Sequence, residues 1–234
     1  MSKTKNARRK VVFLFDVDNT LLNNDAVTAD LQKHLSSEVG ATGAKHYWEL
    51  FETLRKELGY ADYLGALQRY RMKYPHDLRL LTVSRFLIDY PFANRLFANS
   101  LDAIRHVQQW GRAVLLTDGD VVFQPRKVRR SGLFDEVEGH VLIYVHKEHE
   151  LADVAERYPA DHFVMLDDKL RILAAMKKVW KKQLTTIFVR QGHYAVDPVV
   201  VASNPPADMT LERIGDLLNY DLKDLLAAAH PSAP

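Results

Sequence analysis

The stretch "VVFLFDVDNTLLNND", residues 11–25, decides how the rest of the chain is interpreted. Five apolar residues run directly into Asp16, and a second aspartate, Asp18, follows two positions later. The apolar run is typical of a buried parallel strand, and carboxylates at its end are costly to remove from water. Two carboxylates at this point therefore indicate a site with its own chemistry.

Three further apolar or β-branched runs predict additional strands, and helical patterns lie between them. Apolar residues recur at helical spacing in the intervening segments, which favours right-handed strand–helix–strand crossovers. The sequence therefore predicts an α/β fold with a parallel sheet that is covered by helices on both faces. The expected strands are residues 10–16, 112–118, 162–168 and 184–190, and the expected helices are 100–111, 150–159, 170–182 and a closing helix over 210–226.

One region interrupts this alternation, because it has no convincing strand pattern. Three or four helical patterns follow one another there, and two of them end at Pro75 and Pro91. A stripe that includes Tyr47, Phe51 and Leu54 is interpreted as the packing core of this region. We expect a helical domain over 25–93, inserted into a core made of 10–24 and 94–227, with a flexible basic tail over 1–9 and a disordered tail over 228–234.

The composition limits the classes of function. The chain has 234 residues, of which 47% are apolar and 26% charged, as in a soluble globular protein with one sizeable core. A formal net charge of +2 gives no reason to expect a nucleic-acid partner. The run Val11–Phe15 is too short for a signal peptide or a membrane span, and the lack of cysteine excludes thiolate chemistry. We expect a cytoplasmic protein without a membrane or nucleic-acid partner, and its oligomeric state stays open.

Polar side chains end three of the four predicted strands. The first ends in Asp16 and Asp18, and the third ends in Asp167 and Asp168. The carboxyl ends of parallel strands meet at one edge of a sheet, so these carboxylates should converge. Hard oxygen ligands of this kind suit Mg²⁺, and one carboxylate can also attack as a nucleophile. The spacing of two residues places the first pair on one side of an extended chain, so that both can face one phosphorus atom.

The second strand end adds groups suited to a phosphate. The Thr117 hydroxyl can hydrogen-bond a phosphoryl oxygen, and the backbone amides of Asp118 and Gly119 are expected to donate from the start of the next helix. A cation is also needed, and Lys147 is the best-placed candidate. These groups therefore favour a substrate that carries a phosphate group.

These motifs resemble those of the haloacid dehalogenase-like (HAD) superfamily, most members of which are Mg²⁺-dependent phosphatases. "DVDNT" matches the first motif of that family, Thr117 in "VLLTDG" the second, and "MLDDK" the fourth. Lys147 is the candidate for the third motif, and together the four cover residues 10–190 in the right order. The resemblance implies a Rossmann-like core, and it implies that the helical insertion is a C1-type cap that closes over the site and selects the substrate. A cap that closes leaves little room for a protein, so the resemblance also implies a small-molecule phosphorylated substrate.

By this resemblance, Asp16 is the nucleophile that forms an aspartyl-phosphate, and Asp18 is the general acid and base. Asp16, the backbone carbonyl of Asp18, and Asp167 would hold Mg²⁺, with help from Asp168. Thr117, Lys147 and the amides of Asp118 and Gly119 would bind the phosphoryl group.

Two departures from the family pattern stand out. Glu148 follows Lys147 where capped relatives usually have proline, so that Lys127 or His146 stays open as the basic residue of the third motif. The fourth motif has Leu166 where relatives carry glycine, and Arg171 takes the place where some relatives carry a later aspartate, for which the adjacent Asp168 can compensate.

Alternatives to a phosphatase stay open. Within enzymes they are a phosphotransferase (mutase) and a 2-haloacid dehalogenase, although halide displacement needs no proton donor such as Asp18. Outside enzymes, a low-turnover binding or regulatory module on the HAD scaffold is the other interpretation. Two side features are a weak zinc signature and a basic run interpreted as a solvated face, with an acidic docking partner as the minority alternative. The zinc signature comprises His140, His146 and His149. The basic run comprises Arg126, Lys127, Arg129 and Arg130.

Overall fold

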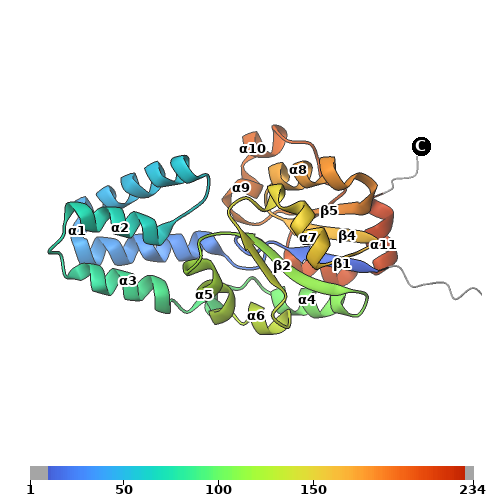
Figure 1. Ribbon diagram of the computed structural model, residues 1–234, viewed down its shortest axis with the longest axis horizontal. Coiled ribbons are helices and arrows are strands. Elements are labelled where there is room, and N and C mark those ends of the chain that lie inside the picture. The colour runs from blue at the N-terminus through green and yellow to red at the C-terminus, as the bar shows by residue number, and fades with distance from the viewer. Residues whose placement is uncertain (1–9, 230–234) are drawn as a thin grey trace, which may run out of the picture.

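The computed structural model describes residues 10–229 and has two lobes, an α/β core and an all-helical lobe (Figure 1). The tail expected over 1–9 lies outside the described residues, as does 230–234, while Ala228 of the other expected tail is the last residue of a helix. The strands are β1 (Val11–Phe15), β2 (Arg112–Asp118), β3 (Val141–Tyr144), β4 (His162–Asp167), β5 (Leu184–Val189) and β6 (Met209–Leu211). The α-helices are α1 (Asn24–Leu58), α2 (Tyr63–Lys73), α3 (Arg79–Asp89), α4 (Ser100–Gln108), α5 (Phe123–Arg130), α6 (Leu133–Glu136), α7 (Leu151–Arg157), α8 (Leu170–Trp180), α9 (Gly192–Val196), α10 (Pro198–Ala202) and α11 (Leu222–Ala228). Short 3-10 helices are η1 (Phe92–Arg95), η2 (Lys147–His149), η3 (Lys181–Gln183) and η4 (Ile214–Asn219).

All six strands pair in parallel, in the order β3-β2-β1-β4-β5-β6. β1 lies in the middle, next to β2 and β4, so the three strand ends that carry the predicted polar groups are neighbours. The α/β prediction with a parallel, Rossmann-like sheet is therefore confirmed. The predicted set lacks β3 and β6, which are four and three residues long and lie at the two edges of the sheet. β6 is too short to be distinguished from a loop, whereas β3 lies in the apolar run 141–145 and could have been predicted from it.

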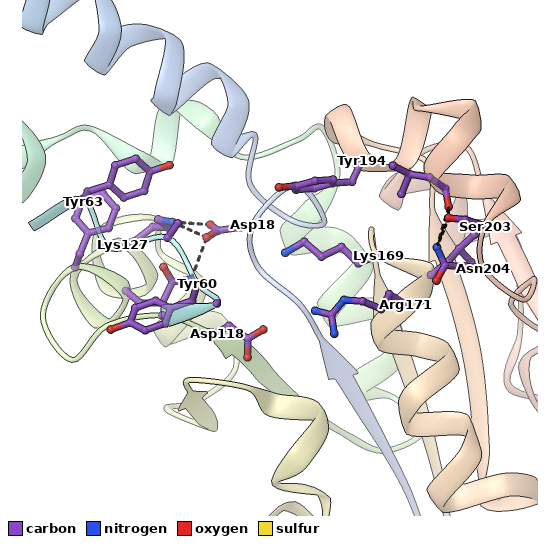
Figure 2. A pocket seen from close by; sticks show the side chains of 17 residues that line it. Asp18, Tyr60, Tyr63, Asp118, Lys127, Lys169, Arg171, Tyr194, Ser203 and Asn204 are labelled. Atoms are coloured by element: carbon purple, nitrogen blue, oxygen red, sulfur yellow. Dashed lines mark hydrogen bonds and ion pairs between the residues drawn. The ribbon is translucent and has the colours of Figure 1, made fainter. Parts of the chain in front are cut away.

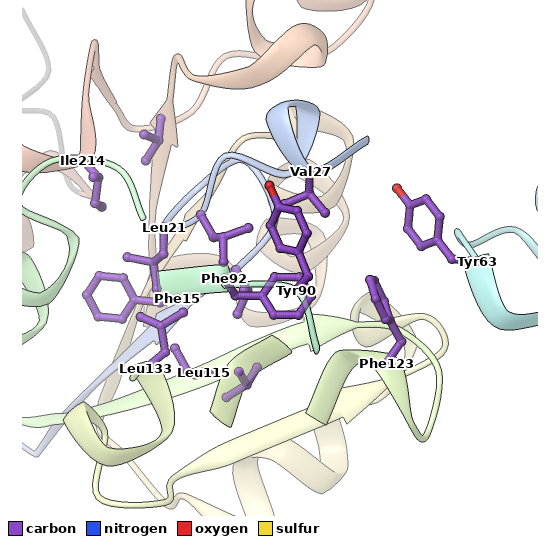
Figure 3. Packing of buried hydrophobic residues seen from close by; sticks show 14 of the residues in the cluster. Phe15, Leu21, Val27, Tyr63, Tyr90, Phe92, Leu115, Phe123, Leu133 and Ile214 are labelled. Carbon is purple, nitrogen blue, oxygen red and sulfur yellow. The ribbon is translucent and has the colours of Figure 1, made fainter. Parts of the chain in front are cut away.

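Alternate residues of β1 pack into two different clusters. Phe13 and Phe15 contact the cluster that includes Ile104 of α4 and Leu225 of α11, whereas Leu14 packs with Met176 of α8. Figure 3 shows part of the first cluster, where Phe15 lies near Leu115 and Leu133. Because successive side chains of a strand point to opposite faces, this division places helices on both faces of the sheet.

The C-terminal segment differs from its prediction as one closing helix. It contains the end of β6, then η4, and then the separate helix α11. Tyr220 is extended between the two helices, and the Asp221 side chain caps α11 by accepting a hydrogen bond from the amide of Asp224. An aspartate at such a position begins a new helix, because its side chain competes for backbone donors.

The helical lobe consists of α1, α2 and α3. α1 begins after Asn23, whose side chain accepts from the amide of Ala26, and its axis is interrupted at Gly40, which has φ 75° and ψ 170°. Gly59 ends α1 in a left-handed conformation that glycine adopts without strain. The predicted stripe is buried and packs in a cluster that continues into the core, where Phe92 and Phe123 lie at the junction (Figure 3).

The chain leaves the core and returns to it at adjacent points. The amide of Asn23 donates to the carbonyl of Arg95 at 2.7 Å, and the amide of Phe97 donates to the carbonyl of Leu21 at 2.9 Å. The helical lobe is thus inserted directly after β1 and lies beyond the carboxyl end of the sheet (Figure 1). Among the described residues, no helix combines the length and apolarity needed to cross a membrane.

Candidate active site

Three carboxylates meet at the carboxyl ends of β1 and β4. Asp16 follows β1, and Asp167 and Asp168 lie at the end of β4. All three are buried, and one oxygen from each lies within 4.8 Å of the others. Buried carboxylates repel one another at this range unless a cation offsets their charge. The structure therefore brings together the side chains of the first and third predicted strand ends.

Lys147 supplies part of that positive charge. It is 2% exposed and begins η2, and its Nζ lies 2.5 Å from Asp16 Oδ1 and 2.7 Å from Asp167 Oδ2. The Nζ also donates to the carbonyl of Leu116 at 3.2 Å. Burial alone would lower the pKa of Lys147, but the charges of Asp16 and Asp167 raise it above its ordinary value. Of the three basic residues considered for the third motif, Lys147 is the one that contacts Asp16.

Two buried threonines, Thr20 and Thr117, belong to the strand ends at the site. Thr20 Oγ1 donates to Asp16 Oδ2 at 3.1 Å and accepts from the amide of Asp168 at 3.0 Å, so it ties the end of β1 to the end of β4. Thr117 Oγ1 accepts from Gln124 Nε2 at 2.9 Å. Thr20 is absent from the predicted site residues, although its place at the end of "DVDNT" could have identified it.

Asp18 is held by a second lysine. Lys127 Nζ donates to both Asp18 carboxylate oxygens, at 2.6 and 2.8 Å, and to Asn24 Oδ1 at 3.0 Å. Lys127 is 1% exposed and comes from α5, whereas Asn24 begins the helical lobe. Figure 2 shows this pair on one side of a cavity, away from α8. Lys127 therefore links Asp18 to the helical lobe, while Lys147 serves the carboxylate cluster.

One of the two expected amide donors at the second strand end, Gly119, is already engaged. The amide of Gly119 donates to the carbonyl of Tyr144 at 2.9 Å, so a neighbouring strand end already uses it. The next helix, α5, begins only at Phe123, where Asp120 accepts from the amides of Val122 and Phe123. The Asp118 side chain accepts from the amide of Lys147 at 2.7 Å. Asp118 thus positions η2, and no helix begins at Gly119.

The basic run on α5 is exposed at its three arginines, as the sequence favours, but Lys127 is buried and two of the arginines also bond to the end of α3. Arg126 donates to the carbonyl of Ile88 at 2.7 Å and to Asp89, and Arg130 donates to the carbonyl of Asp89 at 2.8 Å. These side chains join the core to the end of α3. Their acidic partner is Asp89 of the same chain and not a docking protein. The spacing of the basic residues along α5 does not reveal this partner.

The histidine signature gains no support among the described residues. In the range 10–229, the one group of three or more metal-ligating side chains is the carboxylate cluster of Asp16, Asp167 and Asp168.

The cluster has the chemistry of a divalent cation site. Both oxygens of Asp168 are buried and have no hydrogen-bond partner in the described part of the chain. Burial raises the pKa of Asp167 to about 6, against the opposing effect of Lys147, and burial raises the pKa of Asp168 as well. Lys147 offsets one of the three carboxylate charges, and a divalent cation would offset the other two. The donor set therefore fits a hard cation bound through oxygen.

We expect Asp168→Asn to stabilise the metal-free protein by about 1–3 kcal/mol, because it removes a buried carboxylate without a partner. A raised pKa means that the folded state holds a proton that the unfolded state releases. The contribution of Asp168 to the free energy of unfolding therefore falls as the pH rises from the ordinary pKa of 3.8 toward the raised pKa of Asp168 in the folded state. The stabilisation by Asp168→Asn should accordingly be larger at pH 7.5 than at pH 4.5.

Thermal unfolding in EDTA at the two pH values measures this difference. Asp135→Asn, at an exposed position of α6, is the control and should shift the melting temperature little. A loss of stability in Asp168→Asn at pH 7.5 would contradict the assignment of Asp168 as a strained, unpartnered carboxylate.

A cavity of about 510 Å³ lies between the two lobes and next to Asp18. Tyr60 and Tyr63 line it from the helical lobe, and Lys169, Arg171 and Tyr194 line it from the core. Figure 2 shows Lys169 and Arg171 extending from the start of α8 toward the side that carries Asp18 and Asp118. Sequence reasoning omits Lys169 from the site, although it directly follows the acidic pair. The position of the cavity gives a small molecule access to the strand ends.

Among three comparisons with known proteins, the comparison with solved structures found proteins of similar fold. No model of a protein family matches the chain, and no match was found among curated proteins. The structure of the HAD-hydrolase YfnB from Bacillus subtilis, which is bound to magnesium, is similar in fold. It has 18% identity and a TM-score of 0.61, and the match covers 91% of this chain and 100% of that one. An L-2-haloacid dehalogenase from Xanthobacter autotrophicus has 15% identity and a TM-score of 0.58, covering 89% and 96% of the two chains.

A much closer relative comes from Burkholderia xenovorans LB400. Its crystal structure is described as that of a haloacid dehalogenase-like hydrolase, and it is 65% identical to this chain. The match covers 91% of this chain and 99% of the relative, with a TM-score of 0.87. Identity at this level over nearly the whole length, together with the acidic strand ends, places the chain in the family of haloacid dehalogenase-like hydrolases.

Proposed function

We propose that the chain is a Mg²⁺-dependent hydrolase of small-molecule phosphate monoesters. The observation that carries this proposal is the buried cluster of Asp16, Asp167 and Asp168, in which Lys147 contacts two carboxylates and Asp168 has no partner. Mg²⁺ held there would offset the remaining negative charge and the charge of a bound phosphate. The structure of YfnB is described as bound to magnesium, which supports this choice of ion for a similar fold.

Asp16 is the nucleophile in this proposal. Thr20 holds one of its oxygens and Lys147 the other, so the carboxylate has a fixed orientation at the end of β1. Attack on the substrate phosphorus would form an aspartyl-phosphate and release an alcohol. Lys147 and the Thr117 hydroxyl would stabilise the charge on the phosphoryl oxygens.

Asp18 would protonate the leaving oxygen and then activate a water molecule. In this conformation Lys127 engages both carboxylate oxygens of Asp18. Asp18 must therefore give up at least one of these contacts before it can transfer a proton. Because Asn24 of the helical lobe shares Lys127, movement of that lobe as a C1-type cap would be coupled to the release of Asp18.

A second candidate is a 2-haloacid dehalogenase. Two observations favour it: Lys147 already lies between Asp16 and Asp167, and both oxygens of Asp18 are occupied. Displacement of a halide by Asp16 needs no proton donor for the leaving group. The unpartnered Asp168 argues for the phosphatase, because a site without a metal leaves that carboxylate buried and unused.

Release of phosphate and of chloride separates the two candidates. The purified protein is incubated with a panel of phosphate monoesters and with 2-chloropropionate, in Mg²⁺ and in EDTA. We expect phosphate release in Mg²⁺ that falls by at least about a hundredfold in EDTA and recovers when Mg²⁺ is restored. Chloride release that persists in EDTA, without phosphate release, would contradict the proposal and support the dehalogenase.

A further inference from the structure

The cavity beside Asp18 has one basic wall and one aromatic wall. Lys169 and Arg171 lie on the basic wall, at the start of α8. Tyr60, Tyr63 and Phe123 lie on the opposite side and come from the helical lobe and α5. Charges that face an aromatic surface are less well hydrated than charges in open water, so they bind a charged partner more strongly.

Arg171 is fixed by a buried carboxylate. Its Nη1 lies 2.5 Å from Glu148 Oε1, and the Glu148 side chain is 4% exposed whereas that of Arg171 is 62% exposed. Burial would raise the pKa of Glu148, but the hydrogen bond and charge of Arg171 lower it. Among the described residues, Glu148 is the partner recorded for Arg171, so the rest of its guanidinium is open to the cavity. Glu148 and Arg171 both depart from the family pattern, and the fold pairs them with each other.

Lys169 stands beside this pair. Its Nζ lies 5.6 Å from the centre of the Tyr194 ring, and Tyr194 is itself held by a hydrogen bond of 2.7 Å from Arg55 of α1. In the range 10–229, no hydrogen bond or ion pair is recorded for the Lys169 ammonium. The Tyr194 ring holds the Lys169 ammonium near the Arg171 guanidinium, so that two positively charged groups lie on one wall of the cavity.

The acidic groups of the cavity are already engaged. Lys127 pairs with Asp18, and the Asp118 carboxylate accepts from the amide of Lys147. Burial raises the pKa of Asp118 above its ordinary value. A divalent cation with Lys147 would offset the three carboxylates of the cluster. The charge of Lys169 is then in excess on the side where the leaving group of a substrate would lie, and Arg171, although paired with Glu148, keeps guanidinium donors that can bind an anion.

We propose that Lys169 and Arg171 bind a second anionic group on the substrate. The substrate class is a small phosphate monoester whose leaving group carries a carboxylate or a further phosphate. Glu148 acts as a positioning residue, because it holds Arg171 at the cavity without facing the substrate. This inference rests on the proposed phosphatase activity for the reaction, but the binding site that it names can be tested without turnover.

The test uses two probes that differ in one group. 3-Phosphoglycerate and glycerol 3-phosphate share a three-carbon frame and a phosphate, and differ in a carboxylate against a hydroxymethyl group. We expect kcat/KM in Mg²⁺ to favour 3-phosphoglycerate by about tenfold to a hundredfold, as for a charge-assisted contact. Arg171→Gln should reduce this preference about tenfold, mainly through KM, and Arg171→Lys should restore part of it. Glu148→Gln should reduce it less.

The matched control is Arg190→Gln. Arg190 is an exposed arginine paired with Glu212 at 2.9 Å, outside the cavity, so its loss should leave the preference unchanged. A wild-type enzyme that hydrolyses both probes equally, or an Arg171→Gln variant with the wild-type preference, would overturn the proposed subsite.

Failure of the subsite and failure of the phosphatase give different results. Hydrolysis of p-nitrophenyl phosphate without any preference between the two probes refutes the subsite alone. If no ester is hydrolysed, the phosphatase proposal fails, and titration calorimetry on the wild-type protein still decides the subsite. Binding of 3-phosphoglycerate at least about tenfold tighter than glycerol 3-phosphate, lost in Arg171→Gln, supports it, and equal or absent binding refutes it.

Discussion

Asp16→Asn should lower kcat for phosphate release by at least about a thousandfold, because the amide cannot attack phosphorus and no other described carboxylate occupies its position. The replacement keeps the shape of the side chain and retains an oxygen that can accept from Thr20 or Lys147. The fold should therefore persist, with a melting temperature close to or above that of the wild type. Phosphate release under single-turnover conditions, together with thermal unfolding, measures both effects.

The control for this prediction is Asp102→Asn. Asp102 is an exposed aspartate on α4 that pairs with Arg105 at 3.0 Å and does not line the cavity. Its replacement should change neither activity nor stability appreciably. Wild-type turnover in Asp16→Asn would refute the assignment of the nucleophile, and unfolding of that variant would show that Asp16 has a structural role instead.

Lys147→Met should have the largest effect on stability. The ammonium is 2% exposed and contacts two carboxylates that are themselves buried. Removing one partner of such a group leaves uncompensated buried charge and costs about 3–5 kcal/mol. For a chain of this size, that corresponds to a fall in the melting temperature of roughly 10 °C. Turnover should fall by about a hundredfold or more, because a charge near the phosphoryl group is lost.

Two conditions test whether charge is the cause. Mg²⁺ should restore most of the stability of Lys147→Met, because a cation that binds the folded state replaces the missing charge. The loss should also be smaller at pH 5 than at pH 7.5, since Asp167, with its pKa of about 6, takes up a proton below that value. Thermal unfolding in EDTA and in Mg²⁺ at both pH values measures these effects.

Lys45→Met is the matched control. The Lys45 side chain is 79% exposed and lies 3.9 Å from Glu49, so its loss should change stability by less than about 0.5 kcal/mol. If Lys147→Met and Lys45→Met melt at the same temperature in EDTA, Lys147 does not compensate the cluster.

Much of the core follows from local patterns. Apolar runs of five to seven residues mark the strands β1, β2, β4 and β5. Apolar residues at helical spacing mark the helices α4, α7 and α8, so all of these elements can be predicted without the fold. The apolar run 141–145 also marks β3, although the prediction missed it, whereas β6 is three residues long and is recognised as a strand only by its pairing with β5. The segment after Leu211 shows the same limit, because the capping by Asp221 splits one apparent helix into two elements.

The active site likewise has features that the sequence predicts and features that depend on tertiary packing. That Asp16, Asp167 and Asp168 converge follows from sequence, because the carboxyl ends of parallel strands must meet at one edge of the sheet. Which lysine serves which carboxylate does not follow, because Lys127 and Lys147 both lie between β2 and β4. Only the packing of α5 and η2 assigns Lys127 to Asp18 and Lys147 to Asp16.

The sequence by itself therefore determined the class of fold, the helical insertion after β1 and the acidic edge of the sheet. Each of these depends on a residue type at a fixed spacing within one element. The tertiary structure alone decided the pairing of Glu148 with Arg171, the engagement of the Gly119 amide by Tyr144 and the attachment of α5 to α3. Those contacts join side chains or backbone groups from separate elements, and their partners are set by three-dimensional packing rather than by any local pattern.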